Sequence, residues 1–505
     1  MRPQSSAPHA GGEGANPPSI RLLMGALMLV MLLSALDQTI VSTALPTIVG
    51  ELGGLDRLSW IVTAYMLAST LVVPLYGKFG DLFGRKTVLQ ISVILFLIGS
   101  VLCGMAQTMP QLILTRALQG LGGGGLMVVS MAAVADVIPP ADRGKYQGLF
   151  GGVFGLATVI GPLLGGFIVQ HMSWRWIFYI NLPLGLFALL VINRVFNADS
   201  KRKAHEIDYP GAVFLSMALV GITLFTSEGG TLHAWSDPVL WCILAFGIVG
   251  AIGFIYEEQR AWEPIIPLDL FRNRSFSLAS LMALIVGMSL FGSVTFLPLY
   301  LQVVKHATPT EAGLQLLPLM GGLLITSIVS GRIISRTGKY RLFPIAGTLL
   351  ASVGMGLMTT LTPDAPLWHL YLFASILGMG MGMTMQVLVL AVQSAVTPDR
   401  IGVATSSVTL FRSVGGSIGV ALFGAVFSQV LKSGLATLVE QGLALPRSLD
   451  PDAVHHLPDD VQHAYLLAFS DAVHAAFQMA AGVMLLAFVL SLFLPESPLR
   501  NKAGK

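Results

Sequence analysis

The chain has 505 residues, of which 54% are hydrophobic and only 11% are charged, and its formal net charge is +3. Soluble domains carry about 25% charged residues, so the composition excludes a water-soluble globular protein. A net charge this small does not indicate a nucleic-acid partner. The two cysteines, Cys103 and Cys242, lie in apolar segments and lack the spacing of a metal site or a disulfide framework.

Polar and apolar segments alternate along the chain. Residues 1–20 are polar and rich in Pro, Gly and Ala, which predicts a disordered cytoplasmic tail. Fourteen apolar segments follow, each long enough to cross a bilayer, which takes about 20 residues. They are Leu22–Leu45, Leu58–Tyr76, Thr87–Ala106, Gln111–Val137, Tyr146–Val169, Trp176–Phe196, Tyr209–Thr226, Pro238–Tyr256, Phe276–Val304, Ala312–Ser330, Leu342–Leu361, Leu367–Val396, Val403–Leu431 and Ala472–Leu494.

These segments predict an all-α membrane protein of two six-helix halves with an insert between them. Residues 21–196 form the first half and residues 276–495 the second. The seventh and eighth segments form an inserted transmembrane hairpin, which lies with its linkers in residues 197–275. We expect an outer loop at residues 432–470 and a second cytoplasmic tail at residues 496–505.

Two related glycine-rich turns join apolar segments in the two halves. The first, GKFGDLFGRK, runs from Gly77 to Lys86, and the second, GRIISRTGKY, runs from Gly331 to Tyr340. In both turns the glycines are seven residues apart and bases follow the second glycine. The repeat indicates related halves, and a duplicated membrane protein of this kind is most often a transporter.

The distribution of Lys and Arg predicts the orientation in the membrane. With a cytoplasmic amino terminus, 22 of the 29 basic residues lie on the inner side and five on the outer side. The positive-inside rule therefore predicts that both termini and both glycine-rich turns are cytoplasmic. We expect a multi-pass protein of the cytoplasmic (inner) cell membrane.

Two charged residues lie inside apolar segments at similar depth. Asp37 is eight residues before Leu45, and Arg116 is six residues after Pro110, which places them about 12 and 9 Å below the outer surface. An acid at this depth costs roughly 2.5–3.5 kcal/mol on insertion scales, so it usually has a partner or a function. The two residues form either a static ion pair or a site where Asp37 alternately binds a proton and a cationic or polar substrate.

The first glycine-rich turn is the candidate for a cytoplasmic gate. Its candidate residues are Gly77, Asp81, Gly84, Arg85 and Lys86. Glycine permits close backbone approach, and Asp81 can pair with a helix amino terminus or with a base of the other half. Arg85 can reach Asp136 or Asp142. The alternative is a merely anchoring basic loop, and Ser335 replaces the acid in the second turn, so the two turns cannot be equivalent.

A further set of residues is predicted to line a cavity. A methionine-rich stretch in Leu367–Val396 makes an adaptable apolar surface, although a packing or lipid-facing role is equally open. Arg412 either contacts an anionic group or, as the residues favour, holds its helix to neighbouring carbonyls. The candidate lining residues are Tyr65, Phe150, Phe154, Phe296, Gln386 and Arg412.

Several motifs resemble the fourteen-helix drug:proton antiporter branch of the major facilitator superfamily. They are GKFGDLFGRK (Gly77 to Lys86), LDQTIVSTALP (Leu36 to Pro46), LTRALQGLGGGG (Leu114 to Gly125), GLATVIGPLLGG (Gly155 to Gly166), WRWIFYINLPLG (Trp174 to Gly185) and FRSVGGSIG (Phe411 to Gly419). The resemblance runs from about Leu22 to Leu494 and implies the major facilitator fold. It places the acid of LDQTIVSTALP at Asp37. In this family the helix 5 pattern, here Gly161, Pro162, Gly165 and Gly166, is associated with exporters.

These observations predict a proton-coupled antiporter that exports hydrophobic or amphipathic drugs. It would work by alternating access as a monomer, without a cofactor, using the proton gradient as its energy source. A dedicated exporter of a lipid, antibiotic or metabolite is the alternative, and a narrow substrate range would favour it. A receptor or channel would lack proton coupling. An enzyme is disfavoured because the apolar segments hold no constellation of His, Cys or Ser.

Overall fold

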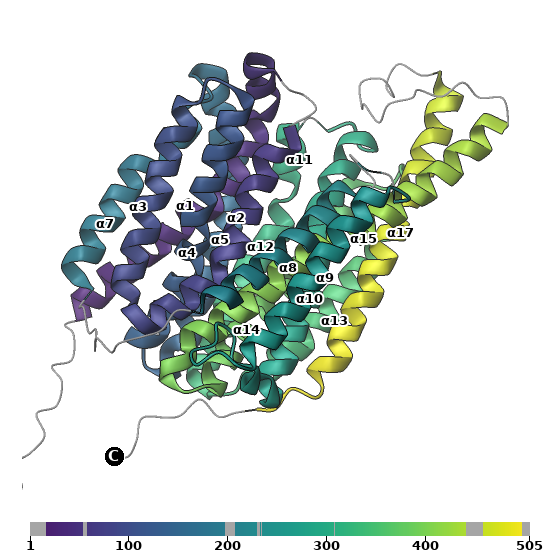
Figure 1. The fold of residues 1–505 in the computed structure, drawn as a ribbon. Helices are drawn as coiled ribbons and strands as arrows, with labels where there is room; N and C mark the ends of the chain where they lie inside the picture. Colours follow the sequence, from purple (N-terminus) through teal and green to yellow (C-terminus); the bar gives the residue numbers. More distant parts are fainter. Residues whose placement is uncertain are drawn as a thin grey trace, which may run out of the picture.

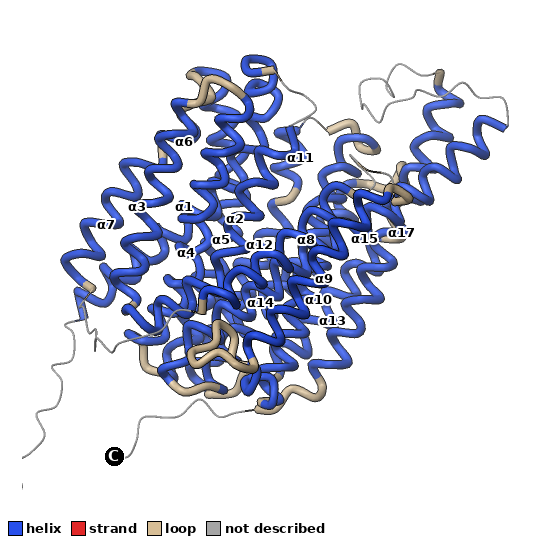
Figure 2. Tube along the Cα trace, in the orientation of Figure 1, coloured by secondary structure: helices blue, strands red, loops and turns tan. Residues whose placement is uncertain are grey.

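The computed structural model describes residues 17–53, 58–196, 208–229, 233, 235–307, 309–440 and 458–496. Within these ranges the chain is helical, apart from turns and one isolated bridge between Gly229 and His233 (Figure 2). The helices up to the inserted hairpin are α1 (Pro17–Leu52), α2 (Leu58–Phe83), α3 (Arg85–Met105), α4 (Met109–Val137), α5 (Pro140–His171), α6 (Trp176–Tyr179) and α7 (Asn181–Val195). The hairpin is α8 (Tyr209–Glu228) and α9 (Pro238–Glu258). The second set is η2 (Leu268–Arg272), α10 (Arg274–Val303), α11 (Pro309–Gln315), α12 (Leu317–Thr337), α13 (Leu342–Met358), α14 (Leu367–Ala395), η3 (Pro398–Arg400), α15 (Ile401–Glu440) and α17 (Asp459–Ser491).

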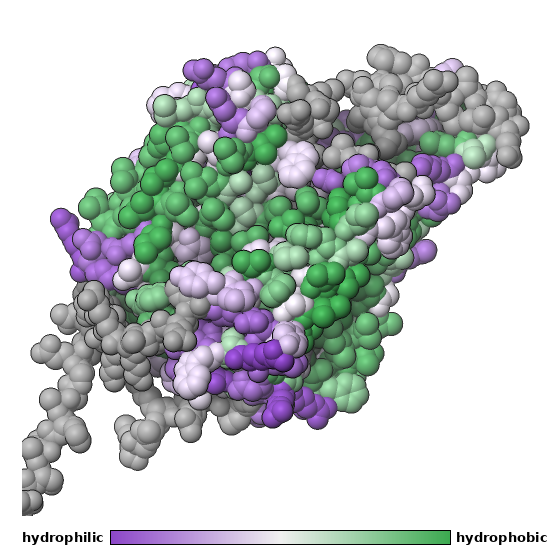
Figure 3. Space-filling model, in the orientation of Figure 1, coloured by the Kyte–Doolittle hydropathy of each residue, from purple (hydrophilic) through white to green (hydrophobic). Residues whose placement is uncertain are grey.

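Among the described residues, thirteen helical segments are long and apolar enough to cross a membrane. The remaining predicted span lies in α13, an apolar helix of 17 residues, which is about 26 Å long and at the short end of the usual range. Apolar side chains cover the flank of the molecule between two polar ends (Figure 3). The predicted all-α membrane fold is confirmed.

The helices form two groups that meet along long helix pairs. Helices α1 to α7 lie together on one side of Figure 1, and α10 to α17 on the other. Between the groups, α5 packs along α12 and α2 packs along α15. The hairpin helix α8 packs on α9 and also contacts both α2 and α15, so the insert lies against the junction of the two groups.

Helix starts follow from the local sequence. Asp208 accepts a hydrogen bond from the Gly211 N–H at 2.8 Å and caps α8. Asn273 accepts from the N–H groups of Ser275 and Phe276 and caps α10. Such side chains satisfy backbone donors that the first helical turn leaves unpaired.

The glycine run in LTRALQGLGGGG allows α4 to pack tightly between two neighbours. A Cβ atom on Gly120 would overlap the Tyr65 backbone on α2, and one on Gly122 would overlap the Phe96 backbone on α3. Because small residues let helix backbones approach closely in a membrane, this run fixes the position of α4. The site described below depends on that position.

Two predicted boundaries were wrong. Helix α1 begins at Pro17, inside the expected tail of residues 1–20, and residues 1–16 lie outside the described residues. The expected outer loop of residues 432–470 is helical at both ends, because α15 continues to Glu440 and α17 begins at Asp459. Polar residues with good helix propensity do not stop a helix where it leaves an apolar environment, so hydropathy placed these ends too early. The expected tail of residues 496–505 is described only at Glu496.

Both described ends of the chain lie on one face of the bundle (Figure 1). We call it the basic face; it carries Lys78, Lys86, Lys145 and Arg336 near the ends of α2, α12 and the starts of α3 and α5. The linker before α10 reaches the same end of α2, where the side chains of Ile265 and Ile266 are buried against Val73.

Candidate functional site

Asp37 lies at the centre of a buried polar network. Its Oδ2 accepts a hydrogen bond from Arg116 Nη1 at 2.6 Å, and its Oδ1 accepts from Gln119 Nε2 at 2.7 Å and from Asn181 Nδ2 at 3.2 Å. Both members of the ion pair are almost completely buried, with side-chain exposures of 0% for Asp37 and 1% for Arg116. Burial of two charges costs several kcal/mol per ion unless geometry and further hydrogen bonds offset it, and here three donors converge on one carboxylate.

Arg116 is held in place from several directions. Its Nε donates to the Ile61 carbonyl at 3.2 Å, its Nη1 also donates to Gln119 Oε1 at 2.6 Å, and its guanidinium carbon lies 4.3 Å from the centre of the Tyr65 ring. Ser100 completes the network, because its Oγ accepts from Gln119 at 2.9 Å and from Asn181 at 3.3 Å. The network therefore joins α1, α2, α3, α4 and α7.

Sequence reasoning found Asp37 and Arg116 but missed Gln119, Asn181 and Ser100. Gln119 lies three residues after Arg116, so it shares a face of α4. Asn181 is a polar residue between apolar ones in WRWIFYINLPLG. Both were detectable as polar groups at membrane depth. The sequence did not distinguish Ser100 as a site residue, because serines are frequent in apolar helices.

Two pockets lie between the groups of helices, next to this network. The outer pocket is the one farther from the basic face, and its volume is about 190 Å³. It is lined by Gln38, Thr39, Val62, Tyr65, Met66, Arg116, Phe154, Thr158, Leu290, Phe291, Met320 and Leu323. The lining brings Arg116 and Tyr65 to the edge of the space in which a small molecule would bind.

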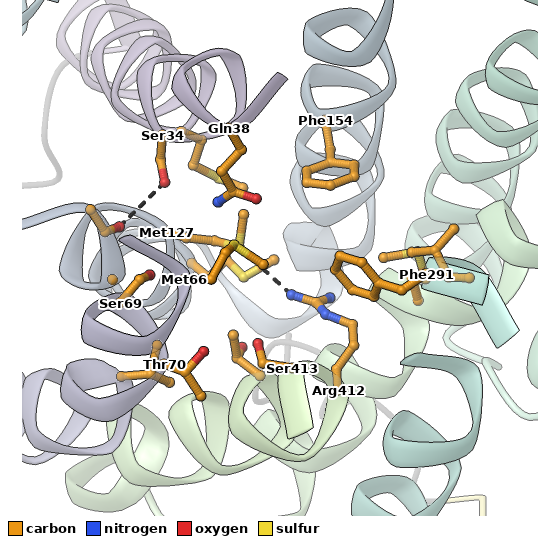
Figure 4. A pocket seen from close by; sticks show the side chains of 18 of the residues that line it. Ser34, Gln38, Met66, Ser69, Thr70, Met127, Phe154, Phe291, Arg412 and Ser413 are labelled. Atoms are coloured by element: carbon orange, nitrogen blue, oxygen red, sulfur yellow. Dashed lines mark hydrogen bonds between the residues drawn. The ribbon is translucent and has the colours of Figure 1, made fainter. Parts of the chain in front are cut away.

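The inner pocket lies nearer the basic face, since it uses α2 residues two turns further along the helix. Its volume is about 60 Å³. It is lined by Met31, Ser34, Gln38, Met66, Ser69, Thr70, Val73, Gly123, Gly124, Met127, Met131, Phe154, Leu290, Phe291, Met385, Gln386, Thr409, Arg412 and Ser413 (Figure 4). Five residues line both pockets, so the two are adjoining.

The predicted cavity residues divide into two sets. Phe154 lines both pockets, Tyr65 lines the outer one, and Gln386 and Arg412 line the inner one. Phe150 is buried and lines neither pocket, and Phe296 instead packs on Phe427 with ring centres 5.4 Å apart. Composition does not reveal which way a helix presents an aromatic ring, so the sequence could not separate Phe150 and Phe296 from Phe154.

Asp81 joins the two groups of helices at the basic face. Its Oδ1 accepts from the Gly402 N–H at 3.0 Å and its Oδ2 accepts from the Val403 N–H at 2.9 Å. These donors belong to the first turn of α15, where an acid also interacts favourably with the helix dipole. Arg85 pairs with Asp81 and, through Nε, with Asp136 at 3.0 Å. Of the two acids expected to meet Arg85, the structure places Asp136 there.

The other residues of the first turn serve this junction in different ways. A Cβ on Gly77 would overlap the Ser406 side chain of α15, so glycine is needed for the close approach. Gly84 has a φ of +89° at the start of α3, which L-residues with side chains rarely adopt. Lys86 Nζ donates to the Asn193 carbonyl at 2.8 Å and ties α3 to α7.

The second turn closes the basic face against α5. Ser335, which stands where the first turn has its acid, accepts a hydrogen bond from the Lys145 N–H at 2.9 Å. Gly338 ends α12 with a φ of +69°. A Cβ on Gly148 would overlap the Ser327 carbonyl oxygen of α12, whereas one on Gly155, two turns further from the basic face, would lie 3.7 Å from Leu323. The two helices are therefore tightest at the basic face.

Two glycines of the helix 5 pattern, Gly161 and Gly165, pack against the first group of helices. Cβ atoms on Gly161 and Gly165 would overlap Thr39 and Thr43 of α1, which is in the same group as α5. One on Gly166 would meet nothing within 4 Å, and the side chain of Pro162 lies outside the described residues. The contact with α12 is made earlier in the helix, by Gly144, Gly148 and Gly151. Glycine spacing in a membrane helix indicates close packing but does not identify the partner helix.

Two helical groups that enclose pockets beside a buried ion pair define a multi-pass membrane transporter. Residues 27–420 match the family model of the Major Facilitator Superfamily. The chain therefore belongs to the major facilitator superfamily.

The similar proteins are named as transporters or resistance proteins, and each matches nearly the whole of this chain. An uncharacterised MFS-type transporter of Mycobacterium tuberculosis is 41% identical over 98% of this chain and 72% of its own. The multidrug transporter protein MdtP of Bacillus subtilis is 36% identical over 96% and 94%. Multidrug resistance protein 3 of the same organism is 34% identical over 97% and 98%.

Solved structures agree on the fold. The proton:xylose symporter XylE superposes with a TM-score of 0.64 at 15% identity, covering 96% of this chain and 98% of its own. The human organic anion transporter MFSD10 superposes with a TM-score of 0.63 at 16% identity, covering 94% and 100%. At this identity the likeness concerns the fold alone.

Proposed function

We propose that this transporter exports hydrophobic or amphipathic compounds from the cytoplasm in exchange for protons. The observation that carries the proposal is the buried Asp37–Arg116 pair at the edge of the outer pocket. Relatives named multidrug transporter and multidrug resistance protein, at 36% and 34% identity, support the class of cargo. The apolar lining of the outer pocket is suited to such cargo.

Asp37 would carry the proton because its environment depends on the arrangement of the helices. With Arg116, Gln119 and Asn181 all donating to it, the ionised carboxylate is stabilised. If α1 and α4 move relative to each other, Asp37 is separated from Arg116, and a proton can take the place of the guanidinium as the balancing positive charge. A proton would thus be bound in one state and released in the other.

We assign the basic face to the cytoplasm, because Lys78, Lys86, Lys145 and Arg336 lie on it and the positive-inside rule favours the cytoplasmic side for such residues. The state described here is then closed towards the cytoplasm, by the Asp81 contact with α15 and by the tight seam of α5 against α12. Alternating access would break these contacts. The dedicated export of one lipid, antibiotic or metabolite is the alternative, and it uses the same machinery.

Inside-out vesicles with an imposed proton gradient test the proposal. The wild type should accumulate amphipathic dyes from a panel, and Asp37→Asn should abolish the gradient-driven part of that accumulation, since an amide of the same size cannot exchange a proton. Asp364→Asn, an identical change at an exposed site between α13 and α14, is the matched control and should accumulate dye normally. Normal accumulation by Asp37→Asn would remove Asp37 from the mechanism, and transport of one dye only would favour the dedicated exporter.

A further inference from the structure

Arg412 lies in the inner pocket as a buried cation without an acid. It belongs to α15 in the second group of helices and reaches across to α4 of the first, where its Nη2 lies 3.6 Å from the Met127 sulfur. Its residue exposure is 8%. Figure 4 shows the guanidinium directed into the pocket, beside the ring of Phe291.

No described carboxylate forms an ion pair with Arg412, and no described carbonyl accepts a hydrogen bond from it. The other buried arginine of the cavity, Arg116, is different because Asp37 neutralises it at 2.6 Å. A guanidinium stays charged in proteins and offers five N–H donors, and a thioether sulfur is only a weak acceptor. Retaining such a group in a buried site is costly unless something else neutralises it.

The pocket around Arg412 supplies further polar groups but no negative charge. The Oε1 atom of Gln386 is buried and has no hydrogen-bond partner among the described residues. Ser69, Thr70 and Ser413 add hydroxyl groups to the lining (Figure 4). Among the described residues that line the two pockets, the charged side chains are Arg116 and Arg412. Because Asp37 neutralises Arg116, the positive charge without a partner is that of Arg412.

We propose that the inner pocket binds the anionic head group of an amphipathic substrate, such as a carboxylate or sulfonate, through Arg412. This inference rests on the proposed export function, because only that function makes the bound anion the transported molecule. For Arg412 it favours contact with an anionic group over the structural role that the sequence favoured.

The two adjoining pockets match the two ends of such a molecule. The outer pocket offers Val62, Leu290, Met320 and Leu323 to an apolar body, and the inner pocket has the size of a head group. Arg116 and Arg412 line different pockets, so a head group at Arg412 leaves the Asp37–Arg116 pair intact. The proton site and the head-group site are therefore separate.

A matched pair of fluorescent probes tests the proposal without transport. 8-Anilinonaphthalene-1-sulfonate and N-phenyl-1-naphthylamine share an aromatic skeleton and differ by the sulfonate. With purified protein in nanodiscs, corrected for empty nanodiscs, we expect the wild type to bind the sulfonate about tenfold more tightly than the neutral probe, as for one charge-assisted hydrogen-bonded contact. Arg412→Met should remove this preference while keeping the neutral probe bound, and Arg412→Lys should retain part of it.

The controls separate binding from folding. Arg272→Met changes an exposed arginine of η2 and should keep the preference. Removing a buried charge that has no partner removes the cost of its desolvation, and binding of the neutral probe reports the integrity of Arg412→Met. The proposal is overturned if the wild type shows no preference, if Arg412→Met keeps it, or if Arg412→Met loses both probes alike. The probe-binding experiment uses no proton gradient. Its result therefore does not depend on whether the vesicle experiment shows proton-driven export, and the two proposals can fail separately.

Discussion

The seam between α5 and α12 gives the sharpest prediction for alternating access. A methyl group at Gly148 would overlap the Ser327 carbonyl oxygen and lie 3.1 Å from its carbon, whereas ordinary contacts begin at 3.4 Å. Backbone atoms cannot rotate away as a side chain can, so Gly148→Ala must separate the two helices at the basic face. We expect overpacking to cost the closed state about 1–3 kcal/mol.

The open state has no such overlap once α5 and α12 part, so the cost acts on the equilibrium between the two states. A difference of that size corresponds to a shift of roughly 5–150-fold towards the state open at the basic face. Gly152→Ala is the matched control, one turn along the same helix. Its Cβ would lie 3.5 Å from Leu324, an ordinary contact, and the equilibrium should not change.

Disulfide cross-linking across the seam measures this shift. Cysteines replace Lys145 and Ser335, whose backbone N–H and side chain now share a hydrogen bond of 2.9 Å, in a background where Cys103 and Cys242 are serines. Gly148→Ala should slow cross-linking in proportion to the shift, and Gly152→Ala should match the parent. Equal rates in all three proteins would refute the reasoning that the glycine seam holds this face closed.

Two further predictions concern orientation and pH. Lys339→Cys, at the exposed end of α12, should react with an impermeant thiol reagent only in permeabilised cells. Gly434→Cys, in the part of α15 beyond the apolar segment, should react in intact cells. The reverse pattern would contradict the assigned orientation. Glu51 accepts hydrogen bonds from Arg175 at 2.5 Å and from the Trp174 indole at 2.7 Å, and the bond from Arg175 above all lowers its pKa from 4.5. A lowered pKa means that the contact stabilises the folded protein above about pH 4.5 and is lost as the pH falls through the folded-state value. The difference in thermal unfolding midpoint between wild type and Glu51→Gln should therefore shrink on acidification, and a difference that stays constant with pH would contradict this.

Much of the fold was predictable because long apolar segments indicate transmembrane helices. The pairing of Asp37 with Arg116 followed from equal depth, and the Arg85 contact with Asp136 followed from the ends of neighbouring helices. The depth of a residue in the membrane can be calculated from its position in the helix and a rise of about 1.5 Å per residue. Both arguments used distance along the bilayer normal alone.

Rotation about the helix axis could not be predicted in the same way. Which face of α5 carries Gly161 decides whether it meets α1 or α12, and which face carries Phe150 decides whether it lines a pocket. Buried transmembrane helices are apolar on all sides, so their sequence gives only a weak signal for rotation. Gln119 and Asn181 depend on the same rotation, and their convergence on Asp37 became visible only with the helices packed.

The central claim, proton exchange through Asp37, is tested most directly in proteoliposomes that contain a pH indicator and no initial proton gradient. An imposed gradient of an amphipathic substrate should drive protons in the opposite direction in the wild type, and it should drive none in Asp37→Asn. Equal proton movement in the two proteins, or proton movement in the same direction as the substrate, would contradict the account.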